Sequence, residues 1–234
     1  SSGVHSSCAA NSRNKLSTPV PQLYAVTFID AGSSNETLYR LDPSTDKTLW
    51  SFSMQPVYQH KGSTGPFTYA WESHAQVVNG ILYLKGTASD GYYIYALNAS
   101  NGLLIWKYHY DASRSQDIPT FRGPLVANGV VYLTEWTSTN YGQIVALNAS
   151  TGKLLWKQPY GAHEPKLIAA NRNTLYVTGW PDQGMGWVLC AFNAQTGKKL
   201  WQKDHNSNEE PLSWQMACFM PQAYLLLARL RPQT

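Results

Sequence analysis

The fold can be predicted from a segment that occurs four times without gaps, here in its third copy: Ile144-Val-Ala-Leu-Asn-Ala-Ser-Thr-Gly-Lys-Leu-Leu-Trp156. The counterparts are Leu38-Tyr-Arg-Leu-Asp-Pro-Ser-Thr-Asp-Lys-Thr-Leu-Trp50, Ile94-Tyr-Ala-Leu-Asn-Ala-Ser-Asn-Gly-Leu-Leu-Ile-Trp106 and Leu189-Cys-Ala-Phe-Asn-Ala-Gln-Thr-Gly-Lys-Lys-Leu-Trp201. Successive tryptophans lie about 50 residues apart, which is in the range of propeller blade repeats. A tyrosine in an apolar run precedes each tryptophan, at Tyr24, Tyr83, Tyr132 and Tyr176. The repeat therefore predicts an array of similar structural units.

Each unit is expected to contain four short antiparallel strands. Asn79-Gly80 and Asn128-Gly129 stand between apolar runs, and Asn-Gly favours a type I′ hairpin because both residues accept a positive φ. In the next connection, Gly152 suits a left-handed residue and Asn148 suits a side chain that hydrogen-bonds its own turn. Four strands in about 50 residues predict a propeller blade, and no helical periodicity competes with this interpretation.

The predicted fold class is an all-β propeller with four Trp-bearing blades and a partial fifth. The unit boundaries are about 19–54, 70–108, 121–158 and 163–203, with the partial unit at 211–232 and a flexible N-terminal segment at 1–18. The partial unit offers strands at Trp214–Phe219 and Tyr224–Leu230. Two arrangements would protect its edges: the N-terminal segment pairs with the last blade, or the chain is part of a larger propeller. The abundance of Ser, Asn and Gly in residues 1–17 favours the larger propeller.

Composition narrows the class of protein. The chain has 234 residues, 13% aromatic and 14% charged, which excludes intrinsic disorder and suits one all-β domain. A net charge of +4 without a Lys/Arg cluster argues against nucleic acid, and no apolar run is long enough for a membrane helix. Cys8, Cys190 and Cys218 form neither a CxxC pair nor a zinc pattern, and allow at most one disulfide. Low charge with many aromatic and small polar residues favours an extracytoplasmic protein.

The pattern Ala-x-Asn-x-x-Thr-Gly-x-x-x-Trp resembles the tryptophan-docking repeat of the PQQ-like (quinoprotein) β-propeller family. It is intact from Ala146 to Trp156 and from Ala191 to Trp201. The first repeat departs from it, with Arg40 in place of Ala and Asp46 in place of Gly, so Asp46 must tolerate a left-handed backbone. A residue that recurs once per blade is expected to pack between blades, and this structural role is assigned to Trp50, Trp106, Trp156 and Trp201.

The resemblance implies two kinds of function. Dehydrogenases of the family use eight blades, pyrroloquinoline quinone (PQQ), a calcium ion, a catalytic Asp and, in many members, a vicinal Cys-Cys disulfide. This chain has no Cys-Cys pair and about half that length, so we expect a non-catalytic scaffold or sensor module with no cofactor, no catalytic residue and no metal ligand. The alternative is a fragment of a PQQ-dependent alcohol or sugar dehydrogenase, with quinone and calcium as cofactors.

One propeller face collects the residues that the repeat does not explain. In a four-stranded blade, the connection between the second and third strands emerges on the same face as the connection to the next blade. All five tryptophans outside the repeat map to this face. Exposed aromatic side chains with a few charges suit recognition, so a protein, peptide or glycan partner is expected on this face. The alternative for each tryptophan is filling between blades. The opposite face is expected to carry only short turns. The predicted binding residues are Trp71, His74, Arg122, Trp136, His163, Trp180 and Trp214.

Overall fold

The computed structural model describes residues 22–27, 35–56, 75–88, 91–111, 120–136, 142–161, 163–180, 186–205 and 227–230. Regular structure in these ranges consists of β-strands alone. The first nine are β1 (Leu23–Thr27), β2 (Asn35–Leu41), β3 (Thr48–Pro56), β4 (Gln76–Val78), β5 (Ile81–Ala88), β6 (Gly91–Asn98), β7 (Leu104–Asp111), β8 (Thr120–Ala127) and β9 (Val130–Trp136). The others are β10 (Gln143–Asn148), β11 (Leu154–Pro159), β12 (His163–Ala170), β13 (Thr174–Trp180), β14 (Trp187–Asn193), β15 (Lys199–His205) and β16 (Leu227–Leu230).

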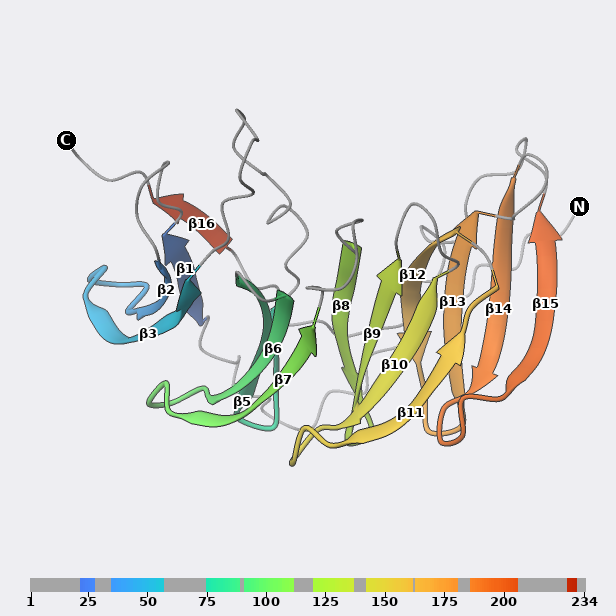
Figure 1. Ribbon diagram of the computed structural model, residues 1–234. Coiled ribbons are helices and arrows are strands. Elements are labelled where there is room, and N and C mark those ends of the chain that lie inside the picture. The colour runs from blue at the N-terminus through green and yellow to red at the C-terminus, as the bar shows by residue number, and fades with distance from the viewer. Residues whose placement is uncertain are drawn as a thin grey trace, which may run out of the picture.

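The strands form four sheets of four strands each, which stand side by side in an arc (Figure 1). Three sheets follow the chain, in the orders β4-β5-β6-β7, β8-β9-β10-β11 and β12-β13-β14-β15, and all their neighbours are antiparallel. The fourth has the order β16-β1-β2-β3. Each sheet carries one repeat tryptophan on its last strand. The predicted all-β propeller with four Trp-bearing blades is confirmed.

The second strand expected in the partial fifth unit, Tyr224–Leu230, contributes its last four residues to the first blade instead. Leu227–Leu230 pairs with β1 in parallel, with Tyr24 opposite Leu227 and Thr27 opposite Leu230. The first repeat contributes only β1, β2 and β3 to its sheet, so the inner edge of β1 needs another strand for its backbone hydrogen bonds. A hydrophobic pattern identifies a strand but not its partner, which is why the sequence placed this segment in an antiparallel fifth unit. Trp214–Phe219 lies outside the described residues.

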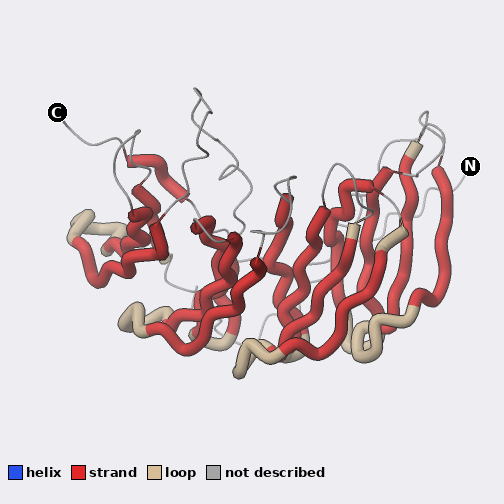
Figure 2. Tube along the Cα trace, in the orientation of Figure 1, coloured by secondary structure: helices blue, strands red, loops and turns tan. Residues whose placement is uncertain are grey.

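The hairpin turns have the predicted backbone. The φ angles are 51° at Asn79 and 75° at Gly80, and 50° and 78° at Asn128 and Gly129. Positive values at both central residues are those of a type I′ turn, which matches the twist of the flanking strands. These turns lie at the lower margin of the array in the orientation of Figure 2.

The turn between the third and fourth strands is nearly the same in every blade. The Asn148 carboxamide oxygen accepts hydrogen bonds from the backbone N–H groups of Ser150 and Thr151, both at 3.0 Å, as the sequence predicts. The N–H of Gly152 then donates to the carbonyl of Asn148 at 2.8 Å. Gly152 has a φ of 70°, and Asp46 in the first blade has a φ of 53°. Asp46 therefore adopts the left-handed conformation that its position requires.

The hydrophobic core lies between neighbouring blades rather than inside one sheet. Between the third and fourth blades, Tyr132 and Trp156 pack with Leu175 and Val177. Similar clusters join the first blade to the second and the second to the third. Each sheet buries both faces of its inner strands, so β10 and β14 consist mainly of buried residues. Blade-to-blade packing thus fixes the position of every strand end.

Candidate binding surface

The repeat tryptophans join each blade to the next. The indole N–H groups of Trp50, Trp106 and Trp156 donate hydrogen bonds to the carbonyls of Ala99, Ala149 and Ala194, at 3.2, 2.8 and 3.2 Å. Each indole also lies flat against the turn glycine of the next blade. A Cβ atom added to Gly102, Gly152 or Gly197 would come within 2.6 Å of the indole that packs there. These glycines supply the space that the docked ring needs.

Trp201 has the same place in its repeat but a different environment. Its side chain is 41% exposed, whereas Trp156 is 8% exposed. The described residues include no fifth sheet beyond β15 on which the Trp201 indole could pack. Trp201 still contacts Tyr176 of its own blade, with ring centroids 6.1 Å apart. The last described blade thus presents an open aromatic edge.

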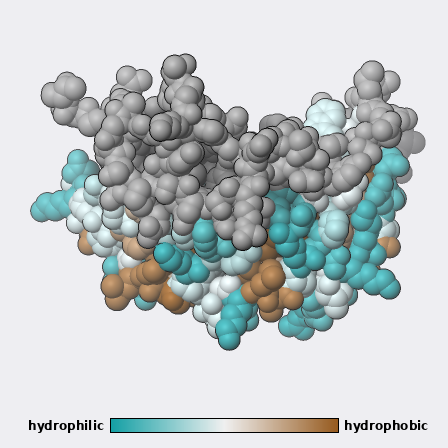
Figure 3. Space-filling model, in the orientation of Figure 1, coloured by the Kyte–Doolittle hydropathy of each residue, from teal (hydrophilic) through white to brown (hydrophobic). Residues whose placement is uncertain are grey.

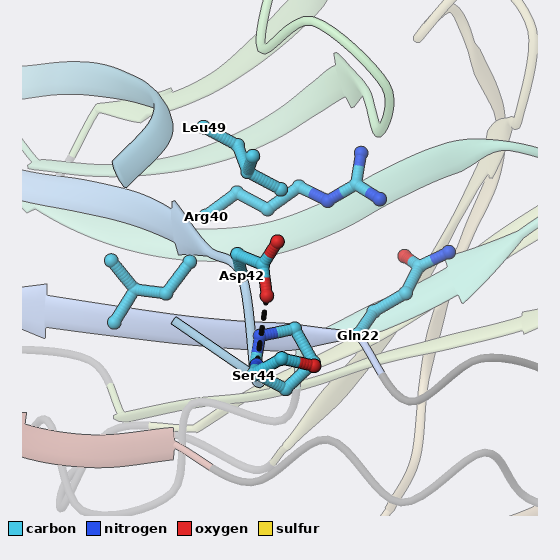
Figure 4. A pocket seen from close by; sticks show the side chains of 7 residues that line it. Gln22, Arg40, Asp42, Ser44 and Leu49 are labelled. Carbon is cyan, nitrogen blue, oxygen red and sulfur yellow. Dashed lines mark hydrogen bonds between the residues drawn. The ribbon is translucent and has the colours of Figure 1, made fainter. Parts of the chain in front are cut away.

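In the first blade, a residue that departs from the repeat forms a hydrogen bond to the next blade. Arg40, which replaces alanine, donates to the carbonyl of Ala99 at 2.7 Å, so this oxygen accepts from both Arg40 and Trp50. Beside the Arg40 side chain lies a pocket of about 240 Å³, lined by Gln22, Arg40, Leu41, Asp42, Pro43, Ser44 and Leu49 (Figure 4). In this pocket, one oxygen of the Asp42 carboxylate accepts from the backbone N–H groups of Ser44 and Thr45, at 2.8 and 3.2 Å. Arg40 and Asp42 therefore both form hydrogen bonds that stabilise the fold.

The predicted recognition face contains a pair of tryptophans. Trp180 ends β13 and Trp187 begins β14, and their ring centroids lie 4.4 Å apart with an interplanar angle of 34°. Trp180 is 42% exposed, and Trp187 is partly exposed. The connection between β13 and β14 is one of those predicted to form the recognition face. The contact holds the two indoles as one unit with an open surface.

The backbone places three other predicted residues near strand ends. Trp136 is the last residue of β9, just as Trp180 is the last residue of β13. His163 begins β12 and stands opposite Trp180, whereas Arg122 stands opposite Thr134. His163 and Trp180 thus come together in one strand pair, and Trp136 belongs to the neighbouring blade. Trp71, His74 and Trp214 lie outside the described residues.

A buried ion pair precedes Trp136 on β9. Glu135 is 4% exposed, and the Lys157 ammonium nitrogen lies 2.5 Å from its Oε1 atom. Burial raises the pKa of the Glu135 carboxyl, and Lys157 offsets part of that rise. The charge of Glu135 also contributes, after burial, to the raised pKa of the Tyr108 phenol. Since Tyr108 is on β7, the ion pair lies against the boundary between the second and third blades.

The opposite end of the blades carries apolar residues that the sequence analysis did not assign. In the described part of the chain, the exposed large hydrophobic side chains are Leu49, Leu103, Leu104, Ile105, Leu154, Leu155, Trp180, Leu200 and Trp201. All except Trp180 lie on the fourth strand of a blade or in the turn before it. Figure 3 shows hydrophobic patches along the lower part of the visible face. We call the eight exposed residues other than Trp180 the leucine band. In the sequence, the band is marked by the Leu or Ile that directly precedes every repeat tryptophan.

The described residues provide neither a metal site nor a membrane-spanning helix. Within these ranges, no group of three or more His, Cys, Asp or Glu side chains could hold a metal ion. In the same part of the chain, no helix has the length and apolar character needed to cross a bilayer.

Several solved propellers resemble this chain. BamB from Moraxella catarrhalis is 19% identical, with a TM-score of 0.47 over 74% of this chain and 49% of its own. The quinohemoprotein alcohol dehydrogenase ADHIIG from Pseudomonas putida HK5 is 25% identical, with a TM-score of 0.43 over 57% of this chain and 20% of its own. The chain thus spans about half the length of the first structure and a fifth of the second. A search of the curated proteins finds no match.

A family model gives the assignment. The model described as outer membrane protein assembly factor BamB matches residues 34–138 and 122–218. The two matches overlap and together cover most of the chain, including all four repeat tryptophans. They also include the Trp180–Trp187 pair and the whole leucine band. The chain therefore belongs to the PQQ-like propeller family described as outer membrane protein assembly factor BamB.

Proposed function

We propose that this chain is a non-catalytic propeller module that binds a segment of a partner protein on the recognition face. The observation that carries the proposal is the exposed Trp180–Trp187 pair, with ring centroids 4.4 Å apart. A family whose description is an assembly factor supports a protein partner over a small-molecule substrate. The same description supports a site of action outside the cytoplasm, at or near an outer membrane.

The physical case rests on what an exposed indole pair can do. Tryptophan is enriched among the residues that dominate binding energy in interfaces, because its large ring buries much surface with few torsions to immobilise. The tilted contact between the two rings restricts Trp180 and Trp187 before a partner arrives, which reduces the entropy lost on binding. An apolar side chain of a bound segment would cover the open indole surface.

Neighbouring residues would extend this site. We propose that Arg122, Trp136 and His163 provide further contacts from the adjacent strand ends, and that Trp71, His74 and Trp214 belong to the same face. A positive charge at Arg122 favours a partner segment with a carboxylate beside its apolar side chain. The ligand class is therefore an extended, acidic and apolar peptide.

Selection from a random peptide library displayed on phage tests the proposal. Clones selected on the wild type should bind Trp180→Ala poorly and Trp201→Ala normally. Trp201 is the matched control because it is 41% exposed, against 42% for Trp180, and lies at the other end of its blade. Selected peptides that bind Trp180→Ala and the wild type equally would contradict the proposal, as would binding restricted to members of a glycan array.

The non-catalytic character has a separate test. Pyrroloquinoline quinone and Ca²⁺ are added to the purified chain, and quinone absorbance and alcohol or sugar oxidation are followed. We expect no saturable uptake of quinone and no turnover. Saturable uptake accompanied by turnover would support a fragment of a quinone-dependent dehydrogenase instead.

A further inference from the structure

The leucine band is an exposed, mainly aliphatic surface that the proposed partner binding does not involve. Leu103 is 66% exposed, Leu154 is 52% exposed and Leu200 is 51% exposed, although each belongs to a well-packed blade. They lie at equivalent ends of three successive blades, beside the turns that accept or would accept a docked tryptophan. Single exposed apolar residues are normal on a protein surface. Repetition of such residues along one margin marks an interaction surface.

In the third and fourth blades, the charges beside the band are basic. Lys153, Lys198 and Lys199 are exposed next to its aliphatic residues. The segments 98–106, 148–156 and 193–201, which form this end of three blades, contain no Asp or Glu. Acidic residues at the corresponding end occur in the first blade alone, at Asp42 and Asp46. The surface is therefore apolar over the second, third and fourth blades, and basic over the third and fourth.

This composition points to a lipid surface more than to a protein. Interfaces between proteins draw their binding energy mainly from Trp, Tyr and Arg, with Leu under-represented, whereas seven of the eight residues of the band are Leu or Ile. Lysine beside aliphatic residues is typical of interfacial membrane binding, because its stem contacts the apolar region while the ammonium group stays in water. The band also runs along turns and outer strands, so it offers projecting side chains, which suit insertion between headgroups.

We propose that the leucine band is a peripheral membrane-binding surface that recognises anionic phospholipid. The exposed Leu and Ile side chains enter the headgroup region, and Lys153 and Lys198 contact lipid phosphates. The recognition face with Trp180 is at the opposite ends of the strands and so points away from the bilayer. A membrane-attached blade array would thereby present its partner site to the surrounding solution.

Vesicle co-sedimentation tests this proposal. The full chain is mixed with vesicles of phosphatidylcholine alone, or of phosphatidylcholine containing phosphatidylglycerol. We expect binding to the anionic vesicles, weaker binding to the neutral ones, and a decrease as salt is raised. Loss of one lysine contact weakens binding to an anionic surface by about five-fold, so Lys153→Gln with Lys198→Gln should weaken it by about 25-fold.

Two further variants separate the band from other surfaces. Leu103→Ser with Leu154→Ser should reduce binding to anionic vesicles while the melting temperature stays unchanged, because both side chains are exposed. Trp180→Ala is the control and should bind vesicles like the wild type, even if it loses all partner peptides. Failure of this proposal is thus distinguishable from failure of the proposed partner site.

Three results would overturn the proposal. The first is no binding of the wild type to anionic vesicles, and the second is equal affinity for neutral and anionic vesicles. The third is unchanged affinity of the folded Leu103→Ser, Leu154→Ser variant. Concentration-dependent self-association that is abolished by the same leucine substitutions, without vesicle binding, would identify the band as an interface between copies of the chain.

Discussion

The indole nitrogen of Trp106 lies 2.8 Å from the carbonyl oxygen of Ala149, and this hydrogen bond crosses the boundary between two blades. A buried indole N–H needs an acceptor, and the turn of the next blade supplies one. The same turn supplies the glycine against which the ring packs. The hydrogen bond and the ring contact together fix the distance and angle between successive sheets.

The close contact at Gly152 should make this position intolerant of any side chain. Gly152→Ala places a Cβ atom 2.6 Å from the Trp106 ring, in addition to the strain at a φ of 70°. Gly129→Ala is the matched control, because its φ is 78° and no atom lies within 4 Å of the added Cβ. Urea unfolding should show a further loss of about 1–3 kcal/mol in Gly152→Ala. Equal losses would mean that the ring contact is unimportant.

Two tryptophans at the same repeat position should differ in their effect on stability. Trp156→Ala removes a buried side chain and should lower the free energy of unfolding by about 3–5 kcal/mol. Trp201→Ala removes one that is 41% exposed, so its cost should be well below that. Chemical unfolding of both variants under the same conditions makes the comparison. Similar losses would show that Trp201 is as firmly packed as Trp156.

The sequence predicted the blades because their local chemistry is repetitive. Asn128-Gly129 and the Asn148 turn fix backbone angles within a few residues, so their structure can be inferred without the rest of the fold. The pairing of Leu227–Leu230 with β1 joins distant segments and leaves no local mark. Tertiary pairing of this kind is what a strand pattern cannot specify.

The site was predicted less completely than the blades. The sequence assigns Trp180 to the recognition face from its place beside a connection between second and third strands, but its contact with Trp187 depends on the register of β13 and β14. The exposure of Leu154 and Leu155 was missed because consecutive leucines in a strand suggest burial on both faces. In an outer strand, only the side chain that meets the next blade is covered, as at Trp156.

The ion pair between Glu135 and Lys157 predicts a specific pH dependence. Burial holds the folded-state pKa of Glu135 above 4.5, its ordinary value. At pH values between 4.5 and the raised pKa, the folded chain binds more protons than the unfolded chain. The Glu135 carboxyl therefore favours the folded state increasingly as pH falls. Glu135→Gln cannot titrate. The melting temperature of the wild type minus that of Glu135→Gln should therefore rise on acidification, whereas a falling difference would indicate a lowered pKa.

Cys190 should be unreactive in the folded chain. The thiol is buried and free, and burial raises its pKa, with a smaller opposing effect from Lys199. Both conditions suppress the thiolate that alkylating reagents require. In a Cys8→Ser, Cys218→Ser background, iodoacetamide should label Cys190 only after urea unfolding, as followed by mass spectrometry. Rapid labelling without urea would show that this interblade core opens readily.

Partner binding at the Trp180–Trp187 pair is tested by the affinity of one selected peptide for the wild type, Trp180→Ala and Trp201→Ala, measured by fluorescence anisotropy of the labelled peptide. An aromatic residue that dominates an interface contributes at least about 2 kcal/mol, which is about 30-fold in affinity. We expect that loss for Trp180→Ala and unchanged affinity for Trp201→Ala. Equal affinity of all three proteins would contradict partner binding at the Trp180–Trp187 pair.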